Sequence, residues 1–213
     1  MSYTTLSGTS FDLPKQETKG KEDEKDKIAE WLDYCVRDYR AVVKLGKGAF
    51  GTVWQACKAE DCNYAIKVQP VGTREEERFL RSEALLLEEL GRLEISPRLV
   101  SSKVCTGQGF LVQERMDGSC ADFFLPDKRL STLNKTFVVA NIFHQLRRIA
   151  ALGLVHLDLK PANILYSERN GGYVIRIGDL GAVDRSSLPV SAERTETLMN
   201  RQLEQLATWI WQL

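Results

Sequence analysis

Residues 156–163 read HLDLKPAN, and the apolar pair IL follows them directly. Packing does not explain three different polar side chains at such short, fixed offsets. Asp158 can accept a proton, Lys160 can neutralise a phosphate group, and Asn163 can offer an amide oxygen to a cation. The stretch therefore predicts one chemical site that handles a proton, a phosphate and a metal ion, and the rest of the chain is interpreted outward from it.

Downstream of this stretch the sequence predicts a β-hairpin that ends in a second acidic candidate. The hairpin strands are expected at 164–167 and 173–177, because the turn signal Asn-Gly-Gly at 170–172 separates them. Residues 179–181 read DLG directly after the second strand. Asp179 therefore follows a hairpin whose first strand begins directly after the HLDLKPAN loop, which makes it a candidate site residue.

Upstream, the glycine-rich segment LGKGAFGTV at 45–53 lies where two predicted strands, at 39–45 and 52–59, meet. Glycines allow backbone N–H groups to approach phosphate oxygens that side chains would keep away. The G-x-G-x-x-G spacing alone is a weak indicator, because dinucleotide-binding turns share it, but there the glycines join a strand to a helix. An ordinary hairpin turn is the alternative explanation of this segment.

The third predicted strand, YAIKVQPV at 64–71, places Ala65 and Lys67 on one face, because side chains alternate along a strand. Ala65 leaves room for a flat ring, and Lys67 can reach phosphate groups. A helix is predicted at 74–92, with an acidic first turn and Gly91 near its end.

Glu83 is the acid of this helix that we expect to pair with Lys67, because an apolar run follows it directly. The competing acids are Glu75, Glu76, Glu77 and Glu88.

Two more strands are predicted at about 99–104 and 110–114. The layout up to this point is five strands with one helix after the third. Beyond it, the pattern predicts helices at about 136–152 and 199–213.

The composition limits the classes of protein that the chain can represent. Its 213 residues are enough to bury a core as one domain or a two-lobed unit. The formal net charge is zero, which argues against a general binder of nucleic acid or of anionic membranes. No stretch approaches the roughly 18 consecutive apolar residues of a membrane span, and the N-terminus lacks the pattern of a secretory signal.

The five cysteines are scattered, odd in number and without a C-x-x-C pair, and only two histidines could complete a zinc site. This usage favours reduced thiols in a cytoplasmic or nuclear protein. Most of the thiols are expected to be small buried side chains. The cysteines are Cys35, Cys57, Cys62, Cys105 and Cys120.

Residues 1–36 are predicted to form a charged N-terminal tail that ends in a short helix. The segment 15–27 carries charges of both signs at nearly every position, so it is either a solvated helix face or a linker. Ile28, Trp31 and Cys35 then recur at helical spacing, which predicts an amphipathic helix packed on the following domain. Docking of a partner protein is the alternative role for this helix.

From residue 39 to the C-terminus the sequence resembles the eukaryotic-type protein kinase superfamily, in its serine/threonine class. The motifs that carry the resemblance are G-x-G-x-x-G-x-V at 46–53, A-I-K at 65–67, FLVQERM at 110–116, H-x-D-L-x-x-x-N at 156–163 and D-x-G at 179–181. The resemblance implies an α+β bilobal fold. Its N-lobe, at about 39–116, would have five strands and one helix, and its mainly helical C-lobe, at about 117–213, would be truncated.

The resemblance also implies ATP and Mg²⁺ as cofactors and gives each site residue a role. Asp158 would accept the proton of the substrate hydroxyl, and Lys160 would contact the transferred phosphate. Asn163 and Asp179 would hold Mg²⁺. The nucleotide-binding residues would be Leu45, Gly46, Lys47, Gly48, Ala49, Phe50, Gly51, Thr52, Val53, Ala65, Lys67, Glu83, Glu114, Met116 and Leu165.

The chain departs from the family pattern at several places. Leu157 stands where the H-R-D motif has Arg, which predicts weak or absent activation by phosphorylation, as in a non-RD kinase. No A-P-E motif follows, and Gln202 replaces the Asp that usually opens the last helix, so the C-lobe is expected to be shortened. Trp209 and Trp211 would either cover core or form a partner-binding patch.

Two functions remain open on the sequence. The first is ATP-dependent, Mg²⁺-assisted phosphorylation of serine and threonine hydroxyls on protein substrates, with an activating or scaffolding protein as a further partner. The alternative is a nucleotide-binding, pseudokinase-like regulatory module that works through a partner protein. The polar motif residues favour the first function, and the shortened C-lobe favours the second.

Overall fold

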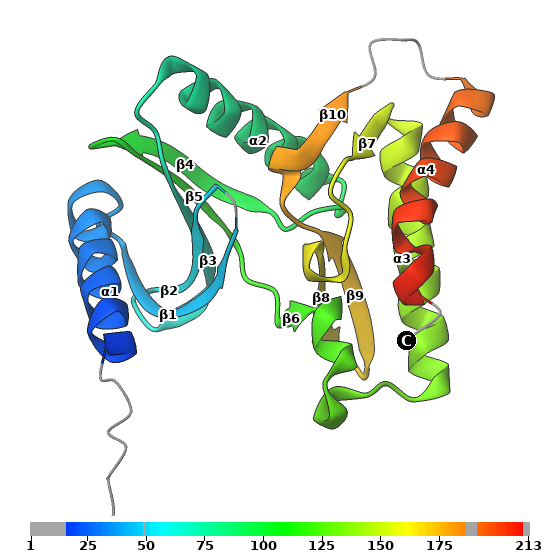
Figure 1. Cartoon of the computed structure of the whole chain (residues 1–213), viewed down its shortest axis with the longest axis horizontal. Coiled ribbons are helices and arrows are strands. Elements are labelled where there is room, and N and C mark those ends of the chain that lie inside the picture. Colours follow the sequence, from blue (N-terminus) through cyan, green and yellow to red (C-terminus); the bar gives the residue numbers. More distant parts are fainter. Residues whose placement is uncertain (1–15, 49, 186–190, 211–213) are drawn as a thin grey trace, which may run out of the picture.

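The computed structural model describes residues 16–48, 50–185 and 191–210, which form two lobes (Figure 1). Ala49, Trp211 and the side chain of Trp209 lie outside the described residues. The α+β class expected from the sequence is confirmed, with a five-stranded sheet in one lobe and two long helices in the other.

The N-terminal lobe is built on one antiparallel sheet with the strand order β1-β2-β3-β5-β4. Its elements are α1 (Gln16–Cys35), β1 (Tyr39–Lys47), β2 (Thr52–Lys58), β3 (Asp61–Pro70), α2 (Arg74–Arg92), β4 (Leu99–Cys105) and β5 (Gln108–Glu114). On β5, Phe110 and Val112 join the buried cluster that contains α1, whereas Leu111 joins the cluster that contains α2. Because side chains alternate along a strand, the two helices cover opposite faces of the sheet.

Helix α2 begins at a capping box formed by Thr73 and Glu76. The Thr73 hydroxyl accepts a hydrogen bond from the Glu76 N–H at 3.1 Å, and the Glu76 carboxylate accepts one from the Thr73 N–H at 2.9 Å. This start sets which side of the helix faces the protein interior. The buried residues of α2 are Leu80, Glu83, Ala84, Leu87, Leu90 and Gly91. Glu83 is therefore the one charged residue on the buried side of this helix.

The C-terminal lobe combines two long helices with short strands. Its elements are β6 (Gly118–Ser119), the 3-10 helices η1 (Cys120–Phe124) and η2 (Pro126–Lys128), α3 (Thr132–Ala151), β7 (Leu154–His156), η3 (Pro161–Asn163), β8 (Ile164–Arg169), β9 (Gly172–Ile177), η4 (Leu180–Ala182), β10 (Val183–Arg185) and α4 (Ala192–Ile210). Strand β10 pairs with β7, and β6, β8 and β9 form a separate sheet. One buried apolar cluster runs from α2 and β5 into α3, β8 and β9, so a single core joins the lobes.

The helix predicted at 74–92 has these bounds in the structure, but other helices differ from their predicted extents. Helix α1 is longer than the short helix expected, and the charged segment belongs to its first part. Helix α4 begins at Ala192, before the predicted start at about residue 199. Among the described residues, no helix has both the length and the apolar character needed to cross a membrane.

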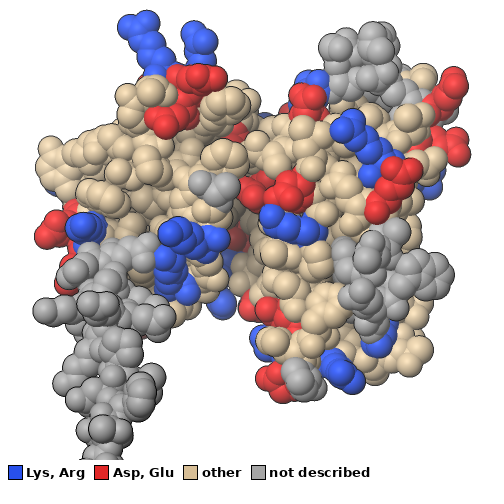
Figure 2. All heavy atoms as spheres, viewed as in Figure 1, with Lys and Arg blue, Asp and Glu red and all other residues tan. Residues whose placement is uncertain are grey.

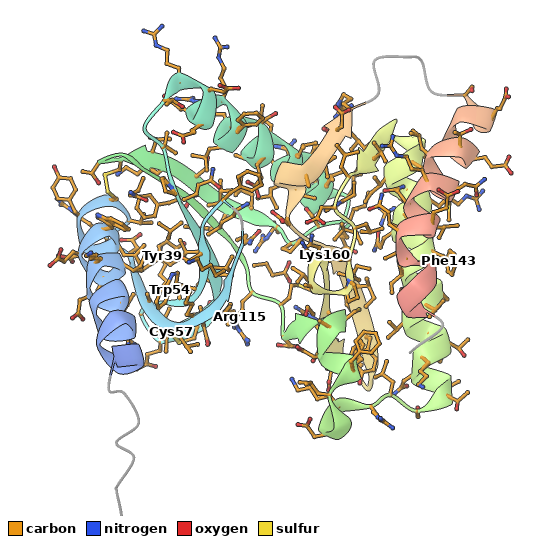
Figure 3. All side chains as sticks on the ribbon, viewed as in Figure 1. Tyr39, Trp54, Cys57, Arg115, Phe143 and Lys160 are labelled. Atoms are coloured by element: carbon orange, nitrogen blue, oxygen red, sulfur yellow. A yellow bond between two sulfur atoms is a disulfide. The ribbon has the colours of Figure 1, made fainter. Side chains whose placement is uncertain are left out.

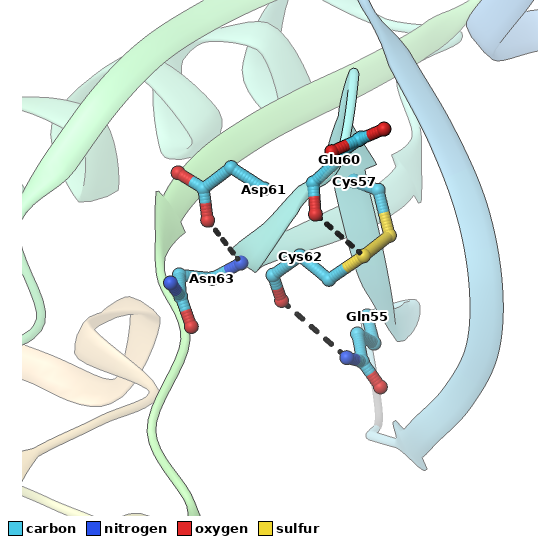
Figure 4. Close-up of a disulfide and its surroundings, with 6 residues drawn as sticks. All are labelled: Gln55, Cys57, Glu60, Asp61, Cys62 and Asn63. Carbon is cyan, nitrogen blue, oxygen red and sulfur yellow. Dashed lines mark hydrogen bonds between the residues drawn. A yellow bond between two sulfur atoms is a disulfide. The ribbon is translucent and has the colours of Figure 1, made fainter.

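The expectation of reduced thiols is wrong for four of the five cysteines. Cys35 and Cys105 form a disulfide that joins the end of α1 to β4 across 70 residues of sequence. Cys57 and Cys62 form a second disulfide across the β2–β3 turn (Figure 4). The Cys35–Cys105 pair leaves no local signal in the sequence, because its partners are 70 residues apart and meet only in the folded sheet. Cys120 is free and buried, and burial raises the pKa of its thiol to about 12.

Candidate active site

A buried ion pair joins the sheet to helix α2. The Lys67 Nζ on β3 lies 2.7 Å and 2.9 Å from the two carboxylate oxygens of Glu83. Both residues are less than a tenth exposed. Burial raises the pKa of Glu83, and the neighbouring Lys67 ammonium opposes that rise. Breaking such a pair would leave one uncompensated charge in the interior, so the pair fixes the position of the lysine.

Asp179 brings a second carboxylate to the same lysine, from the other lobe. Its Oδ1 lies 3.3 Å from the Lys67 Nζ. Asp179 has a φ of 54°, in the left-handed region that Asp and Asn tolerate better than most side chains. A Cβ placed on Gly181 would lie 3.3 Å from the Glu83 carboxylate, so the small residue here lets this loop approach the ion pair. One cation therefore faces two carboxylates, which leaves a net negative charge at this point.

The HLDLKPAN loop places its three polar side chains together. The Lys160 Nζ lies 2.5 Å from the Asp158 Oδ2, and both side chains are about half exposed. The Asn163 side-chain amide donates to the Asp158 backbone carbonyl at 2.8 Å, and Asn163 itself is buried. Lys160 lies on the side of the C-terminal lobe that faces the five-stranded sheet (Figure 3). The Asp158 carboxylate is thus accessible from solvent, whereas its backbone carbonyl is fixed by the hydrogen bond from the buried Asn163.

His156 connects this loop to the segment that carries Asp179. Its Nε2 lies 3.0 Å from the carbonyl oxygen of Gly178, and its Nδ1 accepts a hydrogen bond from the Asp158 N–H at 3.2 Å. These partners assign the proton to Nε2, because a carbonyl only accepts and an N–H only donates. The imidazole is fully buried, and burial lowers its pKa, so it is a neutral linker.

Two glutamines of α4 also hold the HLDLKPAN loop, and sequence reasoning did not assign them this contact. Gln202 accepts from the His156 N–H at 3.3 Å. Gln205 accepts from the Leu159 N–H at 2.8 Å and donates to the His156 carbonyl at 3.2 Å. The available signal was the pair of amide side chains three residues apart, on one face of a helix that carries apolar residues at the same spacing.

The glycine segment forms a tight connection between β1 and β2. A Cβ on Gly51 would lie 2.1 Å from the carbonyl oxygen of Val68, so the packing of β3 requires glycine here. A Cβ on Gly46 would meet nothing within 4 Å, and one on Gly48 would only just reach the Gly51 carbonyl oxygen at 4.0 Å. Packing therefore does not explain these two glycines, whereas close approach of a ligand to the backbone would. The Gly48 N–H itself is already occupied, because it donates to the Gly51 carbonyl at 2.9 Å.

The other described residues of this segment differ in their exposure. Leu45, Lys47 and Phe50 are exposed, and Thr52 and Val53 are partly buried. Val53 lies opposite Lys67 in the β2–β3 pairing. It is therefore next to the buried lysine, as a residue above a bound nucleotide would have to be.

The residues expected around an adenine ring lie where the two lobes join. Ala65 is buried, and Leu165 on β8 packs close to Gly178. The Glu114 N–H already donates to the Arg98 carbonyl at 2.9 Å. Among the described residues, the backbone N–H of Met116 has no hydrogen-bond partner. This N–H can therefore serve as a donor to a ligand edge.

The polar residues suit a magnesium ion better than a transition metal. No group of three or more His, Cys, Asp or Glu residues that could hold a metal occurs in the described part of the chain. Asn163 and Asp179 offer oxygen ligands from two adjacent segments. A hydrogen bond holds these segments together, because the Gly178 N–H donates to the Asn163 carbonyl at 2.8 Å. Mg²⁺ commonly takes one or two protein oxygens and completes its shell with water and phosphate oxygens. The two residues fit that requirement.

The surface around these residues is hollowed between the two lobes, and acidic and basic side chains lie along the hollow (Figure 2). Lys67, Glu83 and Asp179 form one contacting group, and Asp158, Lys160 and Asn163 form another. His156 and Gly178 connect the two groups through hydrogen bonds. The fold thus gathers residues from β3, α2, the HLDLKPAN loop and the DLG segment into one site.

Comparisons with known proteins found sequences that are similar to this chain. The family described as "Protein kinase domain" matches residues 39–200. A probable casein kinase I homolog of Encephalitozoon cuniculi is 28% identical over 145 residues, covering 67% of this chain and 46% of that protein. Serine/threonine-protein kinase chk-1 of Caenorhabditis briggsae is 29% identical over 148 residues, covering 67% of this chain and 29% of that protein.

Ribosomal protein S6 kinase alpha-1 of Mus musculus is 33% identical over 144 residues, covering 64% of this chain and 19% of that protein. The chain therefore spans less than half the length of the curated relatives it matches here.

Proposed function

Because the chain belongs to the protein kinase family, we propose that it transfers the γ-phosphoryl group of ATP to serine or threonine hydroxyls of protein substrates. The observation that carries this proposal is the buried Lys67–Glu83 pair with Asp179 beside it, joined through His156 to Asp158. The serine/threonine class is supported by the D-L-K-P-A-N sequence and by the name of one relative, a serine/threonine-protein kinase.

The nucleotide is proposed to bind where the lobes join. The Met116 N–H would meet the adenine edge, with Ala65 and Leu165 on either side of the ring. The small glycines of the 46–51 segment would let its backbone approach the phosphate oxygens closely, and Lys67 provides a fixed positive charge for them. Asn163 and Asp179 would hold Mg²⁺. When bound, this ion neutralises negative charge on the phosphate oxygens.

Asp158 is proposed to orient the substrate hydroxyl and accept its proton. The hydroxyl oxygen then bonds to the γ-phosphorus as the bond to the leaving ADP oxygen breaks. Lys160 contacts the Asp158 carboxylate in the structure, and it would shift its contact to the transferred phosphate. Positioning and charge neutralisation supply most of the rate enhancement in reactions of this class.

Transfer of labelled phosphate from ATP to a generic basic protein tests this function. We expect Asp158→Asn and Lys67→Met each to lower the rate by about a hundredfold or more, because each removes a group that acts on the reacting atoms. Asp127→Asn, at an exposed residue of η2 outside the site, is the control and should leave the rate unchanged. Transfer that survives both site variants would show that another protein or another site is responsible.

ATP binding without transfer, even with candidate activating proteins present, would instead favour a regulatory module that works through a partner.

Leu157 is proposed to make the enzyme insensitive to phosphorylation of the segment after β10, because it provides no guanidinium to bind a phosphate. A cytoplasmic or nuclear location stays a prediction, and the two disulfides remove the reduced thiols on which it was based.

A further inference from the structure

Gln205 bonds to the HLDLKPAN loop on both sides of the proposed base. Its Oε1 accepts from the N–H of Leu159, and its Nε2 donates to the carbonyl of His156. These two backbone groups enclose Leu157 and Asp158. A single side chain from α4 therefore spans the turn that presents the Asp158 carboxylate, without touching that carboxylate itself.

The rest of the turn is also held through its backbone. The Leu157 N–H donates to the Ala182 carbonyl at 2.8 Å, and the Asp158 carbonyl accepts from Asn163. The Asp158 N–H donates to His156. Gln205 supplies the partner for the next N–H along the chain, so its loss would release the C-terminal side of the turn.

Neighbouring contacts hold Gln205 in place. Gln202 lies one turn earlier on the same helix and is fully buried, with its Oε1 on the His156 N–H. Leu206 is also fully buried and belongs to the core that joins the lobes. Residues at these spacings share one face of a helix, and this face is turned toward the loop. The loop is therefore attached to a helix that is itself anchored in the core.

The chemistry of the loop selects an amide side chain. It presents one donor, the Leu159 N–H, and one acceptor, the His156 carbonyl. An amide donates and accepts, whereas a carboxylate only accepts and would face the carbonyl oxygen with a negative charge. We propose that Gln205 is a positioning residue that holds Asp158 in the geometry needed for proton acceptance, a role that rests on the proposed kinase function.

Two variants of Gln205 separate this role from general stability. Gln205→Leu keeps the size of the side chain and removes both hydrogen bonds, whereas Gln205→Glu keeps the acceptor for Leu159 alone. Glu204→Ala changes an exposed neighbour on the same helix and is the control. Each full-length variant is compared with the parent by amide hydrogen exchange at Leu159, by kcat and KM for ATP, and by thermal unfolding.

We expect Gln205→Leu to lower kcat by about tenfold or more with a change of less than about twofold in KM for ATP, because the proposed nucleotide contacts lie elsewhere. Exchange at Leu159 should be fast in Gln205→Leu and slow in Gln205→Glu, whose kcat should lie between those of the parent and the Leu variant. Glu204→Ala should match the parent in all measurements.

Unchanged exchange at Leu159 in Gln205→Leu would overturn the proposed contact, and faster exchange with unchanged kcat would overturn the positioning role. An equal loss of kcat and of ATP affinity, together with a lowered unfolding temperature, would show a purely structural residue and also overturn it. If the parent transfers no phosphate, the proposed function fails, and exchange at Leu159 still decides whether Gln205 holds the loop.

Discussion

A neutral histidine links the two halves of the site, and its protonation should weaken the fold. His156 is buried between the Asp158 N–H and the Gly178 carbonyl, and burial lowers its pKa in the folded protein. In the unfolded chain a histidine binds a proton with a pKa of about 6.5. Below that pH His156 binds a proton in the unfolded chain but stays neutral in the folded protein. The free energy of unfolding that is present above about pH 6.5 therefore decreases as the pH falls.

This loss can be measured as the free energy of unfolding in denaturant between about pH 7.5 and about pH 5.5. His156→Asn should be less stable than the parent at the upper pH and should lose less stability as the pH falls. His144→Asn, at the exposed histidine of α3, should follow the parent. A parent whose stability is flat across this range, or a His156→Asn variant with the same slope as the parent, would contradict the assignment.

The residues of the site differ in how far the sequence could predict them. Lys67 and Glu83 could be paired in advance because each lies in an element with its own periodicity, and Glu83 precedes an apolar run. Asp158 and Asn163 could be grouped because they share one short loop. Gln205 was not assigned, because its partners lie more than forty residues away in sequence. The local pattern of two amides on one helix face indicates only that the side chain faces inward, and it does not name the partner.

At the scale of elements, a disulfide fastens helix α1 to the sheet. Cys35 at the end of α1 is bonded to Cys105 at the end of β4, and Ile28 and Leu32 pack in the cluster below the helix. Tyr39 and Trp54 of the same cluster lie between α1 and the strands (Figure 3). A bond across 70 residues restricts the unfolded chain, so removing it should cost about 2–4 kcal/mol of stability.

The test compares Cys35→Ser/Cys105→Ser with the parent in denaturant without reducing agent. The Cys57→Ser/Cys62→Ser variant should lose less stability, since that disulfide closes a much shorter loop. Thiol alkylation of the unfolded, unreduced parent should label Cys120 alone, and labelling after reduction should reach all five cysteines. Labelling of all five before reduction would contradict both disulfides.

The predicted elements also show why some helix and strand boundaries cannot be predicted from the sequence. Helix α2 was located because its cap, its acidic first turn and its apolar face all agree. Strands β7 and β10 are only three residues long, and each exists because it pairs with the other. Helix α4 starts seven residues before the predicted position, because its first turns are polar and the apolar spacing begins only with Leu198 and Leu203.

For the whole molecule, the important feature is that one site draws on both lobes. Lys67 and Glu83 belong to the N-terminal lobe, Asp179 and Asn163 belong to the C-terminal lobe, and the core beneath them is continuous. A nucleotide bound between the lobes would contact both and should raise the stability of the whole chain in one step. A ligand at a concentration of about a hundred times its Kd adds about 2.7 kcal/mol to the free energy of unfolding.

In a chain of this length, that contribution should raise the unfolding temperature by about 5–10 °C with ATP and Mg²⁺ together. ATP alone should give a smaller shift, because Asn163 and Asp179 are proposed to act on the phosphates through the metal ion. Asp179→Asn should remove most of the difference between the two conditions, since a neutral amide is a weaker ligand than a carboxylate. Asp184→Asn, at an exposed residue of β10, should respond as the parent does. Equal shifts with and without Mg²⁺ in the parent would argue that the two residues do not form a metal site, and no shift in either condition would argue against nucleotide binding between the lobes.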